Sequence, residues 1–420
     1  MIIVGRHKPA IKGGQYGMAI SRRVWFGRMV QGLLGTALGE TLRSRLAVQA
    51  AGLDAGRHRE GPLITRVTRP FDAETPVREL VAYLTPNHRF FVRSHFGPPM
   101  LESIAEATWT LRVAGAVDKP QTIALDDLRR MQPATVTAVL QCSGNGRAFH
   151  HPKVTGVQWE RGAVGNAEWT GVRLRDLLTE AGVDPRARHV QFLGADRPPL
   201  SSVPLFLRSI PLAKALHPDT LVAYEMNGRP LPVLHGAPLR VITPGWMADS
   251  WTKWLTHITV QEEEAEGYYM QTAYRMPLRP LEPGASPGGE AMTPVEAMTV
   301  KSLICSPGEG DTIPIGPVTI QGVAWSGEER PVKVEVSMDD GLTWNSARFV
   351  GDDRPYAWRQ WQYVWKASTA GTFPVRCRAT DEMGAMQPAV TAWNPGGFMW
   401  NGWDRVMVTV VSNSGMRSAR

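Results

Sequence analysis

The sequence predicts two structural domains in series: an α+β domain followed by an all-β, immunoglobulin-like sandwich. A chain of 420 residues with 43% hydrophobic residues is long enough for two or three domains. Helical and strand patterns alternate from about residue 60 to 275, whereas only period-two patterns occur over 297–415. A Pro/Gly-rich linker over 276–296 separates the two regions.

The first 50 residues are interpreted as an export leader of the twin-arginine type. Ser21-Arg22-Arg23-Val24-Trp25-Phe26 is followed by a weakly apolar run over 29–38 and a small-residue processing site over 48–50. This leader predicts a periplasmic protein exported in the folded state. A disordered basic tail on a cytoplasmic protein is the alternative, and Met18 is a second candidate for the start.

The charge of the chain is concentrated in this same leader. Residues 1–50 contain eight Lys and Arg against Glu40 alone, which accounts for the whole formal net charge of +7. The other 370 residues are therefore neutral in sum, and no basic surface for nucleic acid is indicated. No run approaches the ~20 apolar residues that a membrane span requires.

In the first domain, apolar spacing distinguishes helices from strands. Helical spacing occurs over 123–131 and 172–178, and short runs rich in β-branched residues predict strands over 134–140, 189–193 and 239–242. This mixture indicates an α/β or α+β domain.

In the second domain, alternation with period two predicts strands over 318–325, 332–337 and 375–380. Asp339-Asp340-Gly341 is a turn signal between two of them. Their spacing indicates a small antiparallel sandwich, a kind of domain that usually binds a partner or dimerises.

The three cysteines, at 142, 305 and 377, are too widely spaced for a disulfide framework or a zinc ribbon. Cys142 lies in LQCSGNGRAFHH, where an apolar strand meets a glycine turn and Arg147 follows. A nearby cation and free backbone N–H groups lower the pKa of a thiol. Cys142 can therefore be a buried structural cysteine, a metal ligand, or a nucleophile with His150 or His151 as its base.

Two further segments have the composition of anion sites. TPNHRFFVRSH over 85–95 places Arg93 after an aromatic-rich run, where it could bind an oxyanion. HGAPLR over 235–240, together with Lys253, could bind phosphate. Taken alone, Arg93 fits a salt-bridged surface residue better, and the second segment can also be a solvated loop and a helix face.

Taken together, these segments resemble the sulfite oxidase family of molybdenum enzymes, from about Thr75 to Val410. LQCSGNGR is similar to the family's Leu-Gln-Cys-Ala-Gly-Asn followed by arginine, with Ser143 and Gly146 as departures. The further matches are TPNHRFFVRSH, SIPLAKALHPDTLVAYEMNG, LPVLHGAPLRVITPG, KWL, GVAWSG, VEVSMDDGLTW and WNP, in that order. The resemblance implies a molybdopterin-binding, sulfite oxidase-type catalytic domain over 60–275 and an immunoglobulin-like dimerisation domain over 297–415, hence a homodimer.

The resemblance also implies roles for single residues. Cys142 is expected to be the protein thiolate that binds molybdenum beside the dithiolene of a pyranopterin, and a soft thiolate suits that metal. Arg93, Arg147 and Tyr274 are expected to bind substrate as catalytic residues, with Trp159 as a wall of the pocket. The positions expected to bind molybdenum-molybdopterin are Phe91, Val92, Arg93, Ser94, His95, Asp196, His235, Arg240, Trp251, Thr252 and Lys253.

One departure bears on the substrate. Animal members carry Trp-Asn-Leu-Arg-Gly in the last domain, and that arginine reaches the substrate. Here the segment reads Trp393-Asn394-Pro395-Gly396-Gly397, so one cationic contact is missing. Arg161 and Arg208 are the candidates to compensate for it.

The function implied by the resemblance is molybdenum-dependent oxidation of sulfite to sulfate, with electrons leaving one at a time to an external acceptor. The acceptor is expected to be a separate molecule, because no haem, flavin or NAD fingerprint occurs in the chain. With the export leader, a c-type cytochrome is expected, as in bacterial sulfite dehydrogenases of this family, and dioxygen, used by the plant enzymes, is the alternative. The alternatives are a related molybdopterin oxidoreductase acting on another oxyanion or an S-oxide, similar to methionine sulfoxide reductases, and a secreted two-domain binding protein without catalysis.

Overall fold

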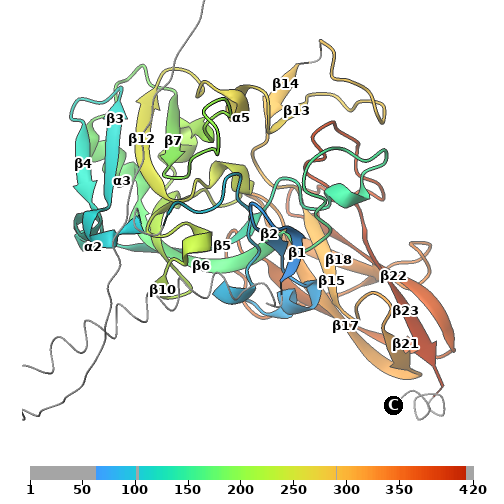
Figure 1. The fold of residues 1–420 in the computed structure, drawn as a ribbon. Helices are drawn as coiled ribbons and strands as arrows, with labels where there is room; N and C mark the ends of the chain where they lie inside the picture. Colours follow the sequence, from blue (N-terminus) through green and yellow to red (C-terminus); the bar gives the residue numbers. More distant parts are fainter. Residues whose placement is uncertain (1–62, 101–103, 290, 413–420) are drawn as a thin grey trace, which may run out of the picture. The chain divides into compact units, whose positions relative to one another are not determined.

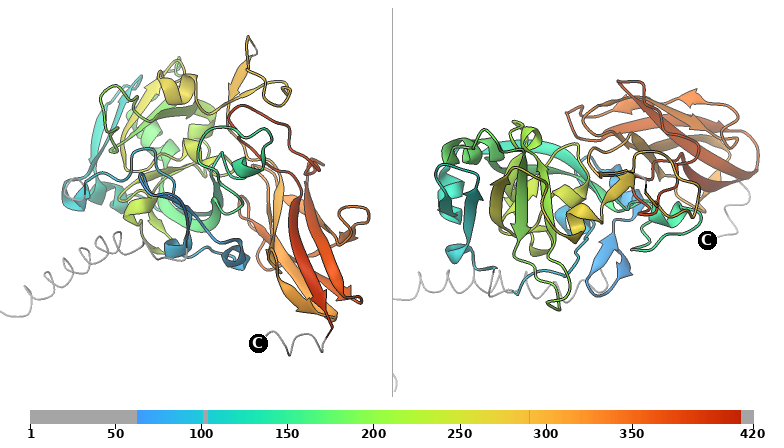
Figure 2. Two further views of the ribbon diagram at one scale, coloured as in Figure 1. Left: turned by 45° about the vertical axis from the view of Figure 1, so that its right-hand side comes forward. Right: turned by 90° about the horizontal axis from the view of Figure 1, so that it is seen from above.

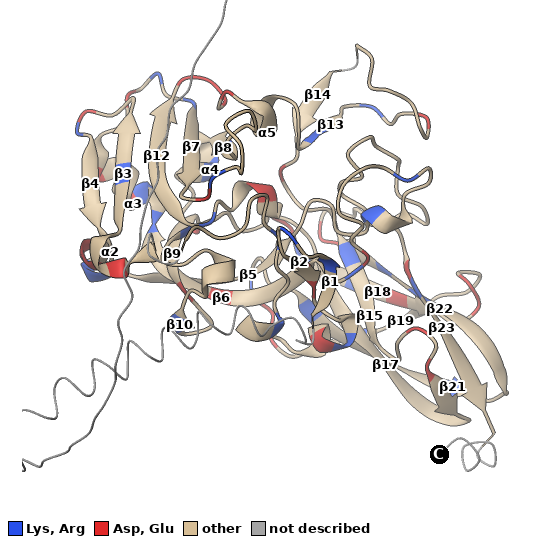
Figure 3. Ribbon diagram, in the orientation of Figure 1, with Lys and Arg blue, Asp and Glu red and all other residues tan. Residues whose placement is uncertain are grey.

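The computed structural model describes residues 63–100, 104–289 and 291–412, which belong to one compact unit of the chain (Figure 1). The predicted twin-arginine leader lies outside these ranges. Two domains follow one another, an α+β domain with few helices and a β domain, and Figure 2 shows them from two further directions. Lysine, arginine and acidic residues are interspersed over both domains (Figure 3).

The first domain contains a five-stranded antiparallel sheet that carries Cys142 at its edge. The strand order is β10-β9-β6-β5, and β11 also pairs with β9. The bounds are β5 Ala134–Gln141, β6 Val164–Arg173, β9 Leu221–Met226, β10 Arg229–Pro230 and β11 Arg240–Ile242. The predicted strands over 134–140 and 239–242 are thereby confirmed within one residue.

A second five-stranded sheet is mixed, with the order β4-β3-β12-β7-β8 and one parallel pair, β3 with β12. Its strands are β3 Thr110–Gly115, β4 Gln121–Ala124, β7 His189–Gly194, β8 Leu207–Pro211 and β12 Leu255–Gln261. The α-helices are α2 Leu125–Arg130, α3 Leu174–Ala181, α4 Leu212–Ala215 and α5 Tyr268–Gln271. Helices α2 and α3 share one buried core with strands β3, β7 and β12, to which they contribute Leu125, Leu128, Leu174, Leu177 and Leu178.

Both predicted helices begin two residues later than expected, because the residues predicted to open each helix are paired in a β-sheet instead. Ile123 pairs with Leu111 in β3, so the helix predicted from 123 starts at Leu125. Val172 pairs with Val222 in β9, so the helix predicted from 172 starts at Leu174. The second helix ends at Gly182, whose φ of 71° is the usual left-handed cap.

Short elements complete this domain. Strands β1 and β2 form a two-stranded sheet, and so do β13 and β14, which lie in the segment predicted as a linker. The strands are β1 Ile64–Val67, β2 Asp72–Glu74, β13 Arg275–Pro277 and β14 Met292–Pro294. The 3-10 turns are η2 Val77–Val81, η3 Asn87–Arg89, η5 Glu106–Thr108, η6 Arg147–Phe149, η7 Val233–His235 and η8 Ala248–Ser250.

The second domain is a sandwich of two sheets, with orders β15-β17-β21-β20 and β16-β23-β22-β18-β19. Residues from both sheets, among them Ile320, Val336 and Trp361, form one buried core. The strands are β15 Lys301–Ser306, β16 Thr312–Pro314, β17 Gly316–Trp325, β18 Pro331–Ser337, β19 Asn345–Ser346, β20 Arg348–Val350, β21 Arg359–Ala367, β22 Gly371–Asp381 and β23 Asp404–Val411. All three strands predicted here lie inside β17, β18 and β22.

The sandwich packs directly on the strand that leads to Cys142. Trp325 Nε1 in β17 donates to Gln141 Oε1 at 2.9 Å, and both side chains are buried. Val139 and Val164 share a buried cluster with Val323 and Trp325. The second domain therefore fixes the end of β5, where the site begins. Among the ranges that the structure covers, no helix is long and apolar enough to cross a membrane.

Candidate active site

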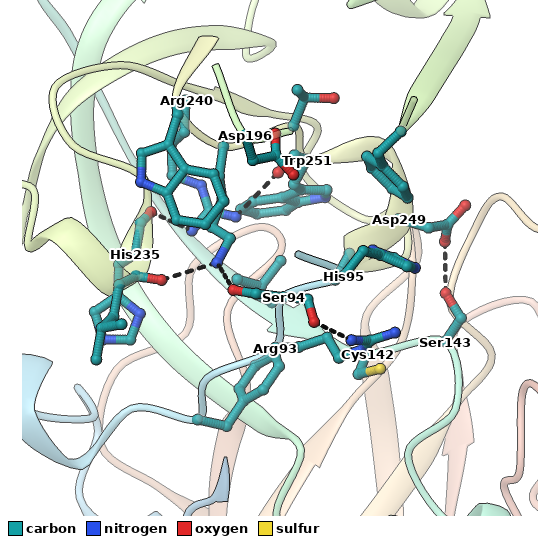
Figure 4. A pocket seen from close by; sticks show the side chains of 18 of the residues that line it. Arg93, Ser94, His95, Cys142, Ser143, Asp196, His235, Arg240, Asp249 and Trp251 are labelled. Atoms are coloured by element: carbon teal, nitrogen blue, oxygen red, sulfur yellow. Dashed lines mark hydrogen bonds between the residues drawn. The ribbon is translucent and has the colours of Figure 1, made fainter. Parts of the chain in front are cut away.

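A cavity opens where β5 ends, and most of the predicted site residues meet in it (Figure 4). The predicted residues that line it are Phe91, Arg93, Ser94, His95, Cys142, Asp196, His235, Arg240, Trp251, Thr252, Lys253 and Tyr274. Residues up to 183 positions apart in the sequence thus line the same cavity, because the loop after η3, the end of β5 and the segment between β11 and β12 converge there. Val92 and Arg147 do not line the cavity.

Cys142 is buried at the start of a tight turn after β5. Its backbone N–H donates to Ala163 O at 2.9 Å, and its carbonyl accepts from Asn145 N at 2.9 Å. Gly146 in the same turn has a φ of 96°, and a Cβ there would lie 2.6 Å from the Trp400 ring. Only glycine fits this position, which explains one of the two departures from the family segment.

The charge around Cys142 is positive. Burial raises the pKa of the thiol, while the charges of Arg93 and Arg147 and the N–H of Gly144 act in the opposite direction. A metal cation would supply the further positive charge that converts such a thiol to the thiolate.

Unsatisfied donors mark the far side of the cavity. Arg240 donates to His235 O at 2.9 Å and to Trp251 O at 3.2 Å, but its Nε has no partner among the residues described. Burial lowers the pKa of Arg240 to about 9. Thr252 Oγ1 is likewise buried and unpartnered within that part of the chain. An anion is the missing partner that would satisfy both groups.

Lys253 extends this group of donors. Its Nζ donates to Ser94 Oγ at 2.7 Å and to Leu234 O at 2.9 Å. Burial, and then the charge of Arg240, lower the pKa of Lys253 to about 7, against the influence of Asp196 and Asp72. A buried ammonium with so low a pKa is in an environment that an additional anion would stabilise.

Arg93 is held in place by an acidic partner that the sequence did not indicate. Its NH1 lies 3.2 Å from Asp72 Oδ2, and the other oxygen of Asp72 accepts the Ser94 N–H at 2.8 Å. Asp72 is itself 1% exposed. This carboxylate fixes the orientation of the Arg93 guanidinium at the cavity wall.

Tyr274 and His95 form a neutral pair beside Cys142. Tyr274 Oη lies 2.9 Å from His95 Nε2, and the His95 ring stacks on Phe206 with centroids 4.4 Å apart. Burial raises the pKa of Tyr274 to about 12, and burial with Arg93, Lys253 and Arg208 lowers the pKa of His95. Tyr274 therefore keeps its proton at neutral pH and, with a φ of 53°, occupies a strained backbone region typical of functional positions.

Arg147 lies behind Cys142 rather than in the cavity wall. It donates from Nε to Gly396 O at 3.1 Å and from NH1 to Val157 O at 3.0 Å. Its guanidinium carbon lies 5.3 Å from the centre of the Phe398 ring. It forms no ion pair with any residue that the structure describes, so its charge is not neutralised by a carboxylate there.

Other predicted contacts are placed elsewhere. Val92 uses its backbone to pair with Ala73, with N–O distances of 2.9 and 2.8 Å. Trp159 is fully buried and does not line the cavity. Neither candidate for the missing arginine is a free cation, because Arg161 pairs with Asp404 at 3.2 Å and Arg208 pairs with Asp249 at 2.5 Å.

The cavity also has walls that the sequence analysis did not identify. These are Leu140, Ser143, Phe206, Leu234, Ala248, Asp249 and Trp254. Asp249 lies two residues before the predicted Trp251, and that proximity was the only signal for it in the sequence.

The two domains match two known families. Residues 95–269 match the oxidoreductase molybdopterin binding domain, and residues 292–411 match the Mo-co oxidoreductase dimerisation domain. Sulfite oxidase of Arabidopsis thaliana is 33% identical over 374 residues, covering 83% of this chain and 94% of the plant protein. The chain belongs to the sulfite oxidase family.

Further relatives extend this comparison. Mitochondrial sulfite oxidase of Rattus norvegicus is 38% identical over 368 residues, which cover 82% of this chain but only 65% of the rat protein. The sulfane dehydrogenase SoxCD from Paracoccus pantotrophus has a similar structure, with a TM-score of 0.71 and 30% identity over 82% of this chain and 86% of that one. The family therefore joins members whose names refer to sulfite and to sulfane sulfur.

The cofactor of this family, molybdenum-molybdopterin, fits the residues present. The unpartnered Nε of Arg240 and Oγ1 of Thr252 suit the terminal phosphate of a pterin, and a single thiol lies across the same cavity from them. The cavity thus presents a soft ligand for the metal and cationic donors for the phosphate.

Proposed function

We propose that this chain is a molybdenum-dependent oxidoreductase that oxidises sulfite to sulfate. The observation that carries the proposal is the position of Cys142, a lone thiol between the charges of Arg93 and Arg147 and in one cavity with unsatisfied phosphate donors. Such an arrangement suits a metal-bound pterin and a small anionic substrate.

In this proposal, Cys142 would be the protein ligand of molybdenum, and the bound metal would supply the two-electron redox chemistry that adds one oxygen, drawn from water, to the sulfur. Arg240, Thr252 and Lys253 would hold the phosphate of the pterin, with Ser94 orienting the Lys253 ammonium. The remaining cofactor contacts are proposed for Phe91, Arg93, His95, Asp196, His235 and Trp251, and Val92 supports the loop through its pairing with Ala73.

Arg93, Arg147 and Tyr274 are the proposed catalytic residues, Arg93 and Tyr274 in the cavity wall and Arg147 through its charge from behind Cys142. Sulfite is a dianion near neutral pH, so fixed guanidinium groups at Arg93 and Arg147 lower its free energy in the pocket. Because the pKa of Tyr274 is about 12, its hydroxyl can donate a hydrogen bond to a substrate oxygen throughout the neutral range. His95, held neutral, orients that hydroxyl.

The electron acceptor and the location are proposed from the sequence. One-electron transfer to an external c-type cytochrome is consistent with a chain in which no haem, flavin or NAD motif is predicted. Export through the twin-arginine route would place the protein in the periplasm, with a cytoplasmic protein as the alternative. The match to a dimerisation domain over 292–411 supports a homodimer.

The direct test is sulfite-dependent reduction of ferricyanide, and then of cytochrome c, by purified protein whose molybdenum is quantified in the same sample. Turnover in proportion to molybdenum supports both the cofactor and the reaction. Cys142→Ser should reduce turnover to below a few per cent, while Cys305→Ser, a buried thiol of the sandwich, should not. Activity in Cys142→Ser with the metal loaded would contradict the ligand assignment.

A second candidate is oxidation of a sulfane sulfur. Gly396 stands where animal members carry the substrate arginine, and a Cβ at Gly396 would lie 2.2 Å from the Phe398 ring, so an aromatic side chain takes the place of a cation. Phe398 in turn stacks on Tyr274 with centroids 5.3 Å apart. At this one position a cationic contact for the substrate is replaced by an uncharged ring, which is the observation that favours a less charged sulfur substrate as the second candidate.

A substrate panel separates these candidates. Sulfite, thiosulfate and a persulfide are offered as reductants, and methionine sulfoxide is offered with a reduced dye for the reductase alternative. A loaded protein that oxidises the persulfide but ignores sulfite would move the proposal to sulfane sulfur. A protein without molybdenum, made in a host that synthesises the cofactor, would favour the binding protein.

A further inference from the structure

Three buried polar residues form a chain of hydrogen bonds behind the metal-ligand candidate. Ser143 Oγ donates to Asp249 Oδ1 at 2.5 Å, as Figure 4 shows, and Arg208 NH2 donates to Asp249 Oδ2 at 2.5 Å. None of the three is more than 5% exposed. We call Ser143, Asp249 and Arg208 the buried triad.

One end of the triad is anchored to the Tyr274 wall. Arg208, in β8, donates from NH1 to Tyr269 O at 2.6 Å, just before the segment that carries Tyr274. Its guanidinium carbon lies 5.5 Å from the centre of the Tyr274 ring. The position of Arg208 is therefore coupled to that of the catalytic tyrosine through both backbone and ring contacts.

The other end is anchored to Cys142 itself. Ser143 is the next residue in the chain, and its carbonyl accepts the Met399 N–H at 2.9 Å while its hydroxyl is held by Asp249. Ser143 is thus held through both its hydroxyl and its carbonyl, and the carbonyl of the peptide that joins it to Cys142 accepts the Asn145 N–H at 2.9 Å. A movement of Ser143 would turn that peptide and with it the Cys142 side chain, so the bond to Asp249 restrains the direction of the sulfur.

The charges of the triad explain why it does not oppose an anionic substrate. Asp249 lines the cavity, but each of its two oxygens accepts a hydrogen bond, and the Arg208 guanidinium balances its charge. A fully buried ion pair gives little net stability compared with apolar residues of similar size. Its presence at this wall is therefore better explained by orientation than by stability.

The sequence also supports a role for Asp249 in orienting this wall of the cavity. The family segment usually has alanine where this chain has Ser143, and an alanine would leave Asp249 Oδ1 without that donor. Ser143 and Asp249, 106 positions apart in the sequence, are thus joined by a hydrogen bond that an alanine at 143 could not make. Both residues line the cavity.

We propose that Asp249 is a positioning residue that acts through Ser143 and Arg208 to fix the direction of the Cys142 sulfur and the place of the Tyr274 ring. This inference rests on the proposed role of Cys142 as the molybdenum ligand. It does not require sulfite to be the substrate, because the geometry concerns the ligand and not the molecule that is oxidised.

The test uses Asp249→Asn and Ser143→Ala in the full, molybdenum-loaded protein. Asparagine keeps the size of the side chain but loses the charge that Arg208 matches. Ser326→Ala is the matched control, because Ser326 is a buried serine of the sandwich that donates to Asp381 Oδ2 at 3.2 Å. The readouts are kcat, KM, the melting temperature and the visible thiolate-to-metal charge-transfer absorption per molybdenum.

We expect Asp249→Asn to lower kcat by about tenfold or more with KM changed less than threefold, and to shift or weaken the charge-transfer band at equal molybdenum. Ser143→Ala should act in the same direction with a smaller effect. The double variant should be no worse than Asp249→Asn alone, because the two residues act through one bond. Ser326→Ala should change only the melting temperature.

Wild-type kcat within twofold and an unchanged band in both variants would overturn the inference, even if their melting temperatures fall. If Asp249→Asn does not load molybdenum, Ser143→Ala, which has the residue that the family usually carries, decides the question. If the wild type does not oxidise sulfite, the proposed substrate is wrong, but the absorption band still tests the positioning role independently.

Discussion

Lys253 should make the cofactor-free protein more stable as the pH rises above about 7. The pKa of Lys253 falls from an ordinary 10.5 to about 7 on folding, because burial and the charge of Arg240 disfavour the ammonium. At about 1.4 kcal/mol per pH unit, that difference corresponds to about 3–5 kcal/mol of destabilisation when the folded protein must carry the proton.

The sign follows from which state binds the proton. Between about pH 7 and 10.5 the unfolded chain keeps the Lys253 proton and the folded protein does not, so the free energy of unfolding rises with pH. Below pH 7 both states are protonated and the destabilisation is complete. Lys253→Met removes this dependence, at the loss of hydrogen bonds to Ser94 and Leu234 that contribute about 1 kcal/mol each.

The measurement is urea unfolding of cofactor-free wild type and Lys253→Met at several pH values. Near pH 6 we expect the variant to be more stable by about 1–3 kcal/mol, and that advantage to shrink by about 2–3 kcal/mol by roughly pH 9. Lys301, whose pKa burial also lowers to about 7, is present in both proteins and cancels in the difference.

A difference between the two proteins that does not vary with pH would refute this reasoning. Binding of the cofactor provides a second check, because a phosphate beside Lys253 should raise its pKa and flatten the pH dependence of the wild type. A Lys301→Met variant should also change the pH dependence of stability, but its response to the cofactor should persist, because Lys253 is still present and Lys301 lies in the sandwich.

Three further outcomes are expected. Tyr274→Phe removes the hydroxyl that lies 2.9 Å from His95 Nε2 and should lower kcat by about 10- to 100-fold in steady-state assays, with unfolding little changed; an undiminished kcat would contradict its role. Gly397→Ala should lower the free energy of unfolding in urea by about 1–3 kcal/mol, because φ at Gly397 is 57° and the new Cβ would lie 2.3 Å from Val154 and 2.8 Å from Arg147. An unchanged free energy of unfolding would show that the loop relaxes around the new methyl group. Sedimentation should show a dimer at micromolar concentration, and a monomer there would overturn the assignment of the second domain as a dimerisation domain in this chain.

Local patterns in the sequence were sufficient to predict many of the strands and helices of the fold. Alternation with period two placed the strands of the sandwich, since successive side chains of a strand point to opposite faces, and burial alternates accordingly along most of β22. The starts of α2 and α3 were wrong by two residues, because pairing with β3 and β9 extends the preceding strands against the helical spacing.

Many residues of the site were also predicted from the sequence, because the segments that resemble the family include Cys142, Arg240 and Lys253. Only the tertiary structure decided which charges remain free. Arg147 bonds to the Gly396 carbonyl 249 positions away and has no carboxylate partner within the described part of the chain, whereas Arg208 is neutralised by Asp249. Ion pairing and burial depend on contacts between distant segments, and neither periodicity nor composition contains that information.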